Sequence, residues 1–282
     1  MIRKIISKFA KTLLRCCQPY NYVEVEVAQI IHGSLLKGKN IVITGGSKGL
    51  GYSMAKKFTA EGARVIIVGR NAETLKTAQE AIGLNCQFIE YDVNDIEKTE
   101  QFLSSCKESF NGNINCLVCN AGISYHESSL LTVTPEGFDD QFNTNLRSCY
   151  FLCQAFIKEQ LSGNQSEANI LITSSETGDM CYDIPYGMTK ASLNTLTRAL
   201  SKRYYSKGIR VNAIAPGVTL SDMTKYAKSN DGNMSRKCAA GRVFLPEEVA
   251  EVACFLLSDA SKCISGEVIH TNAGNHLKAF WD

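Results

Sequence analysis

The sequence lacks the compositional signs of several classes of protein. It has only 5 prolines in 282 residues and neither a low-complexity linker nor an internal repeat, so we expect one folded domain. It lacks an excess of one charge, with 30 basic and 28 acidic residues, which gives no indication of a nucleic-acid partner. It also lacks any run of about eighteen apolar residues, the usual signature of a membrane-spanning helix.

Cysteine, by contrast, is abundant, with 12 residues. Six lie in hydrophobic segments, where a free thiol behaves as a small apolar side chain: Cys116, Cys119, Cys149, Cys153, Cys254 and Cys263. A chain of this size needs no disulfides, so the pattern favours a reducing, cytoplasmic compartment. Cys116 and Cys119 lie in a predicted strand, where residues three apart point to opposite faces. No second pair with zinc-ligand spacing accompanies them, and we predict no metal site.

Residues 1–17 form a distinct amphipathic block, with apolar residues at helical spacing and lysine or arginine on the other side. Three interpretations remain open: a helix docked on the core or on a second subunit, peripheral membrane contact, and an organelle-targeting peptide. The alternating run Val23–Val27 is typical of an edge strand. We expect residues 1–37 to be an extension with a connector, and residues 38–282 to be the folded domain.

From Lys39 onward, short β-branched runs alternate with helical patterns. The predicted strands are Ile41–Thr44, Arg64–Val68, Cys86–Tyr91, Ile114–Cys119, Asn169–Thr173, Ile209–Ala215 and Glu267–His270. The predicted helices include Ala72–Ala81, Ile96–Phe110, Phe138–Leu161, Met188–Tyr205 and Glu247–Leu257. This alternation predicts a single Rossmann-like, doubly wound α/β domain, in which helices cover both faces of a parallel sheet.

A glycine-rich turn follows the first predicted strand and leads into a helical pattern. It reads Thr44-Gly45-Gly46-Ser47-Lys48-Gly49-Leu50-Gly51. Glycine lets the backbone approach a ligand closely, and the start of a helix offers free N–H groups to a pyrophosphate. The spacing is not literally the dinucleotide fingerprint G-x-G-x-x-G, and a plain tight turn is the alternative. Its place in a βαβ series favours cofactor binding.

The end of the second predicted strand lacks the carboxylate that an NAD site places there to bind the ribose hydroxyls. Gly69 and Arg70 occupy this region instead, and Lys48 lies in the glycine turn. Guanidinium binds phosphate through two parallel hydrogen bonds, which suits the 2′-phosphate of NADP. We therefore expect NADP(H) to be preferred over NAD(H). The alternative is that Arg70 is a solvated turn residue.

A tyrosine and a lysine four positions apart, Tyr186 and Lys190, open a helical run and therefore share one helix face. A cation beside a phenol lowers the pKa of the tyrosine, which makes it a useful acid–base group near neutrality. Ser175 ends the fifth predicted strand, at the sheet edge where ligands bind in such folds. Ser174 is an alternative to Ser175.

With these motifs in order, residues 38–275 resemble a classical short-chain dehydrogenase/reductase. The resemblance adds Asn145, which would hold a water for Lys190, to the catalytic group of Ser175, Tyr186 and Lys190. The further cofactor-binding positions that it implies are Asp92, Val93, Asn120, Ala121, Gly122, Pro216, Gly217, Val218 and Ser221. The chain departs from the family pattern at Asn272-Ala273-Gly274, where aspartate–glycine–glycine is usual. The spacing between Ser175 and Tyr186 is also slightly shorter than is usual in the family.

The resemblance implies an NADP(H)-dependent oxidoreductase that interconverts a small-molecule carbonyl and a secondary alcohol. NADPH would deliver hydride while Tyr186 protonates the oxygen, with Ser175 holding that oxygen. Lys190 would bind the nicotinamide ribose and lower the pKa of Tyr186. Candidate substrates include a 3-oxoacyl thioester and a keto-sugar. Alternatives are an NAD-dependent alcohol dehydrogenase of the same family and a non-catalytic cofactor-binding scaffold.

The resemblance also implies a homodimer or homotetramer, paired through the helices over Phe138–Leu161 and Met188–Tyr205. We expect substrate choice to depend on three segments: Ser124–Thr134, Glu176–Pro185 and Ser221–Val243.

Overall fold

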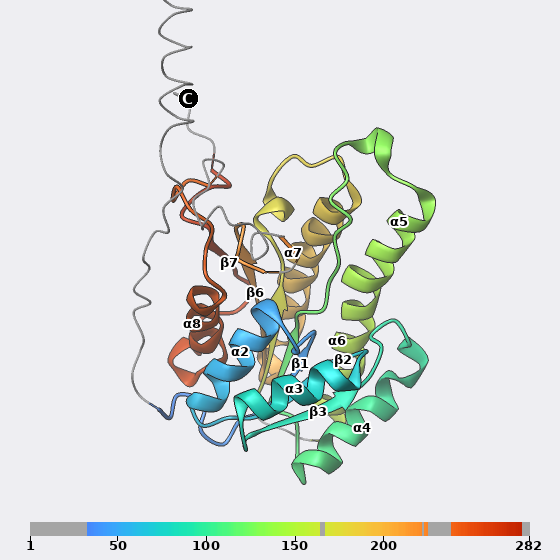
Figure 1. Cartoon of the computed structure of the whole chain (residues 1–282). Helices are drawn as coiled ribbons and strands as arrows, with labels where there is room; N and C mark the ends of the chain where they lie inside the picture. The colour runs from blue at the N-terminus through green and yellow to red at the C-terminus, as the bar shows by residue number, and fades with distance from the viewer. Residues whose placement is uncertain (1–32, 164–166, 222, 225–237, 278–282) are drawn as a thin grey trace, which may run out of the picture.

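The computed structural model describes residues 33–163, 167–221, 223–224 and 238–277 (Figure 1). The amphipathic block of residues 1–17 and the run Val23–Val27 lie outside these residues, as does most of the segment Ser221–Val243. Within the described part of the chain, no helix is long and apolar enough to cross a membrane.

Seven parallel strands form one sheet in the order β3-β2-β1-β4-β5-β6-β7. The strands are β1 (Asn40–Thr44), β2 (Arg64–Gly69), β3 (Cys86–Glu90), β4 (Cys116–Cys119), β5 (Ala168–Thr173), β6 (Ile209–Pro216) and β7 (Val268–Thr271). The predicted fold class is confirmed, and every predicted strand lies within two residues of an observed one. The strand order reverses between β1 and β4. Ligands of doubly wound sheets bind beyond the carboxyl ends of the strands at this switch point.

Helices cover both faces of the sheet (Figure 1). One layer contains α2 (Gly49–Ala60), α3 (Ala72–Ile82) and α8 (Pro246–Leu257); the other contains α4 (Thr99–Phe110), α6 (Ser148–Ser162) and α7 (Pro185–Tyr204). The strands are buried on both sides because each layer packs an apolar stripe against them. Phe58 of α2 anchors one core, and Phe156 of α6 anchors the other; both are fully buried.

The single helix predicted over Phe138–Leu161 is wrong in detail. The chain forms α5 (Pro135–Gln141), then a π-helical stretch, η3 (Phe142–Arg147), and only then α6. Hydrophobic spacing does not detect such a widened turn, which frequently occurs at functional sites. Here the widened turn contains Asn145, which is almost fully buried.

The described cysteines are all free thiols, and five of the six predicted to be apolar packing residues are buried. Cys263 is the exception: it is exposed because it lies in the turn after the short 3-10 helix η7 (Asp259–Ser261). Cys116 packs in the core beneath α2 and α8, whereas Cys119 packs in the core beneath α4 and α6. The two thiols therefore lie on opposite faces of β4, as the strand period predicts.

Candidate functional site

The carboxyl ends of β1 and β4 are joined by a buried threonine. Thr44 Oγ1 accepts hydrogen bonds from the backbone N–H groups of Asn120 (3.0 Å) and Ala121 (3.1 Å). In return, Asn120 Nδ2 donates to the carbonyl oxygens of Thr44 and Gly45, at 3.1 Å each. The side chain of Thr44, predicted as a cofactor contact, therefore lies behind the turn and holds the two loops of the switch point together.

The glycine turn has no room for side chains at two positions. A Cβ on Gly51 would lie 2.1 Å from the carbonyl oxygen of Gly45, and one on Gly46 would lie 2.7 Å from Ile67. Gly45 and Gly49 adopt φ values of +66° and +57°, which favour glycine. The turn consequently presents bare backbone at the start of α2. Ser47 and Leu50, predicted to bind the cofactor, are half-buried there.

The end of β2 presents a cation and no carboxylate. Arg70 is exposed directly after Gly69, and Asn71 caps α3 by accepting a hydrogen bond from Thr74 N at 2.9 Å. Lys48, at the start of α2, is also exposed. The charge pattern predicted from the sequence therefore lies at the sheet edge where the adenosine half of a dinucleotide would lie.

The loop after β3 contains the two positions predicted near adenine. Asp92 and Val93 are half-buried. Asp92 Oδ1 accepts a hydrogen bond from Asn94 N at 2.9 Å, and Asn94 Nδ2 donates to Thr144 Oγ1 at 3.1 Å. This chain of contacts fixes the loop against the π-helical stretch.

The structure brings Ser175 and Tyr186 together. Ser175 lies just beyond β5, and Tyr186 is the second residue of α7, whose first residue is Pro185. Burial raises the pKa of Tyr186, while its hydrogen bond with Ser175 lowers it and the nearby charge of Glu176 raises it further. The net direction is upward from the ordinary value of 10.0.

Lys190 lies one turn further along α7 and is only 4% exposed. Its ammonium donates to the carbonyl oxygen of Thr173 at 2.8 Å and lies 5.5 Å from the centre of the Tyr186 ring. Burial lowers the pKa of Lys190 to about 8. The net direction is opposite to the predicted lowering by Lys190, because burial of the phenol is the largest influence on the pKa of Tyr186 and outweighs the influences that lower it.

Asn145 is held on both sides of its amide. Asn145 Oδ1 accepts from Ile123 N at 2.8 Å, and Nδ2 donates to Ile123 O at 2.9 Å and to Thr189 Oγ1 at 3.2 Å. A Cβ on Gly122 would lie 3.2 Å from Asn145 Oδ1 and 3.7 Å from Lys190 Nζ. The structure thus brings Gly122, Asn145 and Lys190 to one point behind the site.

Ser174, the alternative to Ser175, points away from the site. Its hydroxyl donates to Asn194 Oδ1 and to the carbonyl oxygen of Lys190, and the residue is buried. The geometry therefore favours Ser175 as the serine beside Tyr186.

The segment after β6 closes the crevice from the other side. Pro216 ends the strand, and Gly217 leaves no space for a Cβ, which would lie 2.9 Å from the Cβ of Asn272. Val218 O accepts a hydrogen bond from Phe244 N at 2.9 Å. A Cβ on Gly49 would lie 3.7 Å from the Cβ of Ser221, so this segment approaches the glycine turn.

Sequence reasoning missed a buried carboxylate next to Ser175. Glu176 Oε2 accepts hydrogen bonds from Asn272 Nδ2 at 2.9 Å and from Asn275 Nδ2 at 3.0 Å. Asn272 is fully buried. The departure from the family pattern at Asn272 was the only signal for this contact, and nothing in the spacing pointed to Glu176.

A second missed contact joins the same loop to the C-terminal segment. Asp179 Oδ2 accepts from Asn194 Nδ2 at 3.1 Å and pairs with His270 Nε2 at 2.8 Å. The His270 ring stacks on His276, with ring centres 3.6 Å apart. The loop that follows Ser175 is therefore held by α7 on one side and by the C-terminal segment on the other.

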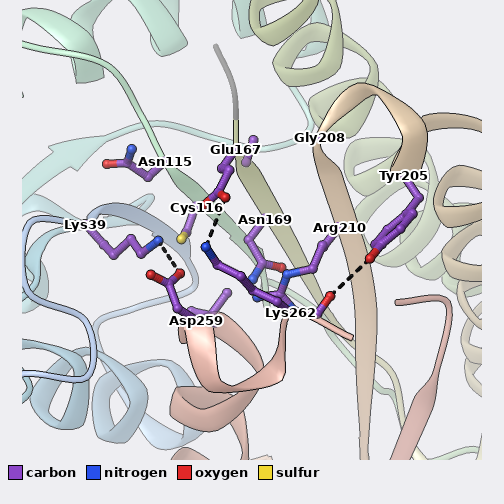
Figure 2. Close-up of a pocket in the computed structure, with 12 residues that line it drawn as sticks. Lys39, Asn115, Cys116, Glu167, Asn169, Tyr205, Gly208, Arg210, Asp259 and Lys262 are labelled. Carbon is purple, nitrogen blue, oxygen red and sulfur yellow. Dashed lines mark hydrogen bonds and ion pairs between the residues drawn. The ribbon is translucent and has the colours of Figure 1, made fainter. Parts of the chain in front are cut away.

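Two cavities lie at opposite edges of the sheet. One, of about 580 Å³, lies at the carboxyl edge between α5 and the predicted substrate segment Ser124–Thr134; its lining includes Tyr125, His126 and Asp140. The other, of about 250 Å³, lies at the amino edge (Figure 2).

The charged groups that line the amino-edge cavity are held in ion pairs or by hydrogen bonds to backbone carbonyls. Figure 2 shows Lys39 pairing with Asp259 (2.8 Å) and Lys262 pairing with Glu167 (3.0 Å). Arg210 donates to the carbonyl oxygens of Ser258, Ser261 and Ile264. These contacts join the first residues of the strands to η7. They lie at the amino edge of the sheet, whereas Tyr186 lies at the carboxyl edge.

The residues at the carboxyl edge fit a nicotinamide dinucleotide. Bare backbone at Gly45 and Gly51 would form a cradle for the diphosphate; a Cβ on Gly51 would collide with Gly45 O, and one on Gly45 would lie 3.0 Å from Ala121 Cα. Arg70 lies at the ribose end, and Tyr186 and Lys190 lie at the other end of the crevice. These residues would hold the cofactor across the switch point.

Comparison with known proteins agrees with this geometry. Residues 45–276 match the family described as enoyl-(acyl carrier protein) reductase. The chain is 36% identical over 247 residues to the 3-oxoacyl-(acyl-carrier-protein) reductase FabG of Chlamydia trachomatis, covering 85% of this chain and 98% of that protein. It is 30% identical over 245 residues to the same enzyme of Escherichia coli, covering 86% and 98%.

Solved structures show the same fold. A short-chain type dehydrogenase/reductase from Mycobacterium marinum superposes with a TM-score of 0.77 at 26% identity, covering 85% of this chain and 96% of that one. Levodione reductase superposes equally well, with a TM-score of 0.77 at 26% identity and coverage of 85% and 98%.

The glycine cradle can be tested with one methyl group. Gly51→Ala places a Cβ against Gly45 O and Asn120 Nδ2, so the turn must shift and we expect NADPH affinity to fall at least about tenfold. Fluorescence titration of NADPH measures this. Gly112→Ala, where the nearest atom is 3.7 Å from the new Cβ, should bind as wild type. Equal affinity for Gly51→Ala and wild type would show that the turn does not hold the diphosphate.

Proposed function

This chain belongs to the short-chain dehydrogenase/reductase family of NAD(P)-dependent oxidoreductases that act on CH–OH and C=O groups, and from that premise we propose that it reduces 3-oxoacyl thioesters with NADPH. The observation that carries the proposal is the placement of three residues: Ser175 just beyond β5, Tyr186 at the start of α7, and the buried ammonium of Lys190 5.5 Å from the centre of the Tyr186 ring. The identity of 36% to a 3-oxoacyl-(acyl-carrier-protein) reductase supports the substrate class.

Each side chain has a separate task in this proposal. The chemistry that bound NADPH supplies is a hydride for the carbonyl carbon. Tyr186 donates its phenolic proton to the carbonyl oxygen, and the Ser175 hydroxyl donates a hydrogen bond to the same oxygen. Lys190 holds its ammonium behind the phenol and stabilises the phenolate that remains. After Tyr186 has given its proton, Lys190 passes a proton toward the phenolate, and a water held at Asn145 replaces the proton that Lys190 gave.

The electrostatics favour the reductive direction. A tyrosine whose pKa is raised stays protonated across the neutral range, so it has a proton to give. The reverse reaction needs the phenolate as base, and burial makes that form costly. We therefore propose that resting Tyr186 carries the proton that reduction requires, while the net direction of turnover follows the ratio of reduced to oxidised cofactor.

A keto-sugar is the second candidate substrate. The carboxyl-edge cavity is lined mainly by groups that hydrogen-bond to hydroxyls, among them Ser128, Thr132, Thr134, Glu136 and Asp140. Such a lining suits a polyol better than an acyl chain. The two candidates are distinguished by comparing both substrate classes in one assay.

We propose that the catalytic domain spans residues 38–282 and acts in the cytoplasm as a homodimer or homotetramer. Large apolar side chains are exposed on the helices that the family resemblance assigns to subunit contacts. Tyr150 and Leu161 of α6 are 47% and 45% exposed, and Met188 of α7 is 41% exposed. Burial of such residues is a usual driving force of association.

Replacing the proton donor should separate chemistry from binding. We expect wild-type protein to oxidise NADPH with a 3-oxoacyl thioester, and Tyr186→Phe to lower kcat by about 10²–10⁴-fold, because the phenolic proton is lost. The dissociation constant for NADPH should stay within about twofold. Tyr205→Phe, at the opposite edge of the sheet, is the matched control and should turn over normally. Equal kcat for Tyr186→Phe and wild type would contradict the mechanism.

The pH dependence of kcat/KM should follow the ionisation of Lys190. Its ammonium form is required, and burial lowers its pKa to about 8, so kcat/KM for reduction should be level below pH 8 and fall about tenfold per unit above it. Tyr186 contributes no fall in this range, since its pKa is raised. Initial rates in a constant-ionic-strength buffer series give the profile. A rate that stays level to pH 10 would rule out the protonated lysine.

Cofactor preference should depend on Arg70. Arg70→Glu removes a charge-assisted hydrogen-bond donor and adds an acceptor for ribose hydroxyls, so the NADPH-to-NADH ratio of kcat/KM should fall at least about tenfold. Steady-state rates with both cofactors measure this ratio. Lys76→Glu makes the same charge change on the exposed side of α3 and should leave the ratio unchanged. If Arg70→Glu leaves the NADPH-to-NADH ratio of kcat/KM unchanged, Arg70 is a solvated turn residue that does not contact the cofactor.

A further inference from the structure

Three buried cysteines meet next to the proposed catalytic lysine. Cys119 is the last residue of β4, and Cys149 and Cys153 lie one turn apart on α6. They are 5%, 6% and 1% exposed. The Sγ atoms of Cys119 and Cys153 are 3.8 Å apart, and all three Sγ atoms lie within 4.8 Å of one another. We name this group the thiol triad.

The spacing of the thiol triad suits metal coordination. A zinc–sulfur bond is about 2.3 Å, so three thiolates around one ion would be about 4 Å apart, close to the observed separations. A disulfide needs about 2.05 Å between sulfurs and would leave the third cysteine unused. Thiolates are the ligands that soft cations prefer.

The charge around the thiol triad also suits a divalent ion. Three thiolates and one divalent cation carry a net charge of −1, and a buried charge needs a partner. Lys190 is close enough to Cys149 to interact with it electrostatically, and its ammonium can offset that charge. The other described buried cysteines do not form such a group with further cysteine, histidine or acidic side chains.

We propose that Cys119, Cys149 and Cys153 form a binding site for a soft divalent cation of the Zn²⁺ or Cd²⁺ class. The site joins the end of β4, just before the loop of Asn120 and Gly122, to α6. The inference does not depend on the proposed substrate.

Cadmium is the probe, because its thiolate complexes absorb in the ultraviolet by charge transfer. The protein carries Cys16→Ser, Cys17→Ser, Cys181→Ser and Cys263→Ser, which remove the exposed described cysteines and the two near the N-terminus. It is kept reduced with a phosphine and loaded with Cd²⁺ either over hours or during refolding, since the site is buried. We expect one Cd²⁺ per chain by equilibrium dialysis, together with the charge-transfer band.

Matched variants distinguish the thiol triad from other cysteines. Cys149→Ser and Cys153→Ser should each lose the band, whereas Cys106→Ser, buried on α4 in the same core but outside the triad, should keep the band and the stoichiometry. If a serine variant fails to fold, Cys153→Ala preserves an apolar side chain and takes its place. If the protein with the four serine substitutions folds in the presence of Cd²⁺ but holds no Cd²⁺, the proposal is overturned. An unchanged band in Cys149→Ser or Cys153→Ala would also overturn it.

Discussion

The arrangement of the site depends on one buried charge, the ammonium of Lys190. An ion moved from water into protein costs several kcal/mol unless its surroundings compensate. Here the main compensation is a carbonyl oxygen, that of Thr173, which β5 leaves unpaired at its end because the strand stops there. The parallel sheet therefore supplies the acceptor, and α7 supplies the lysine. Neither element could hold the charge without the other.

This constraint explains the irregular backbone around the lysine. A Cβ on Gly122 would lie 3.2 Å from Asn145 Oδ1, closer than an ordinary contact, so a side chain there would press on the amide that lies beside Lys190. Asn145 in turn sits on a π-helical turn that aims its amide at Ile123 and Thr189 rather than along the helix. The amide contacts of Asn145 tie this widened turn to the loop after β4 and to α7. The irregularity is thus part of the packing that positions the lysine.

The sequence predicts much of the sheet because the strands are short, β-branched and buried on both faces, and such runs fit few other kinds of secondary structure. It also predicts that Ser175 and Tyr186 meet, because Ser175 ends a strand at the carboxyl edge and Tyr186 opens the helix that follows that strand. It did not predict Glu176 with Asn272, or Cys119 with Cys149. The first of these contacts joins residues 96 positions apart in the chain and the second joins the end of β4 to α6, and only the tertiary fold brings them together.

The C-terminal segment shows how such long-range contacts offset local strain. Ala273 adopts φ +50°, a conformation that costs a residue with a side chain roughly 1–2 kcal/mol and that the family's usual glycine would adopt freely. The strain is maintained because its neighbour Asn272 is fully buried and donates to Glu176, beside Ser175. The loop that begins at Glu176 is therefore held in place by Asn272, a residue 96 positions further along the chain.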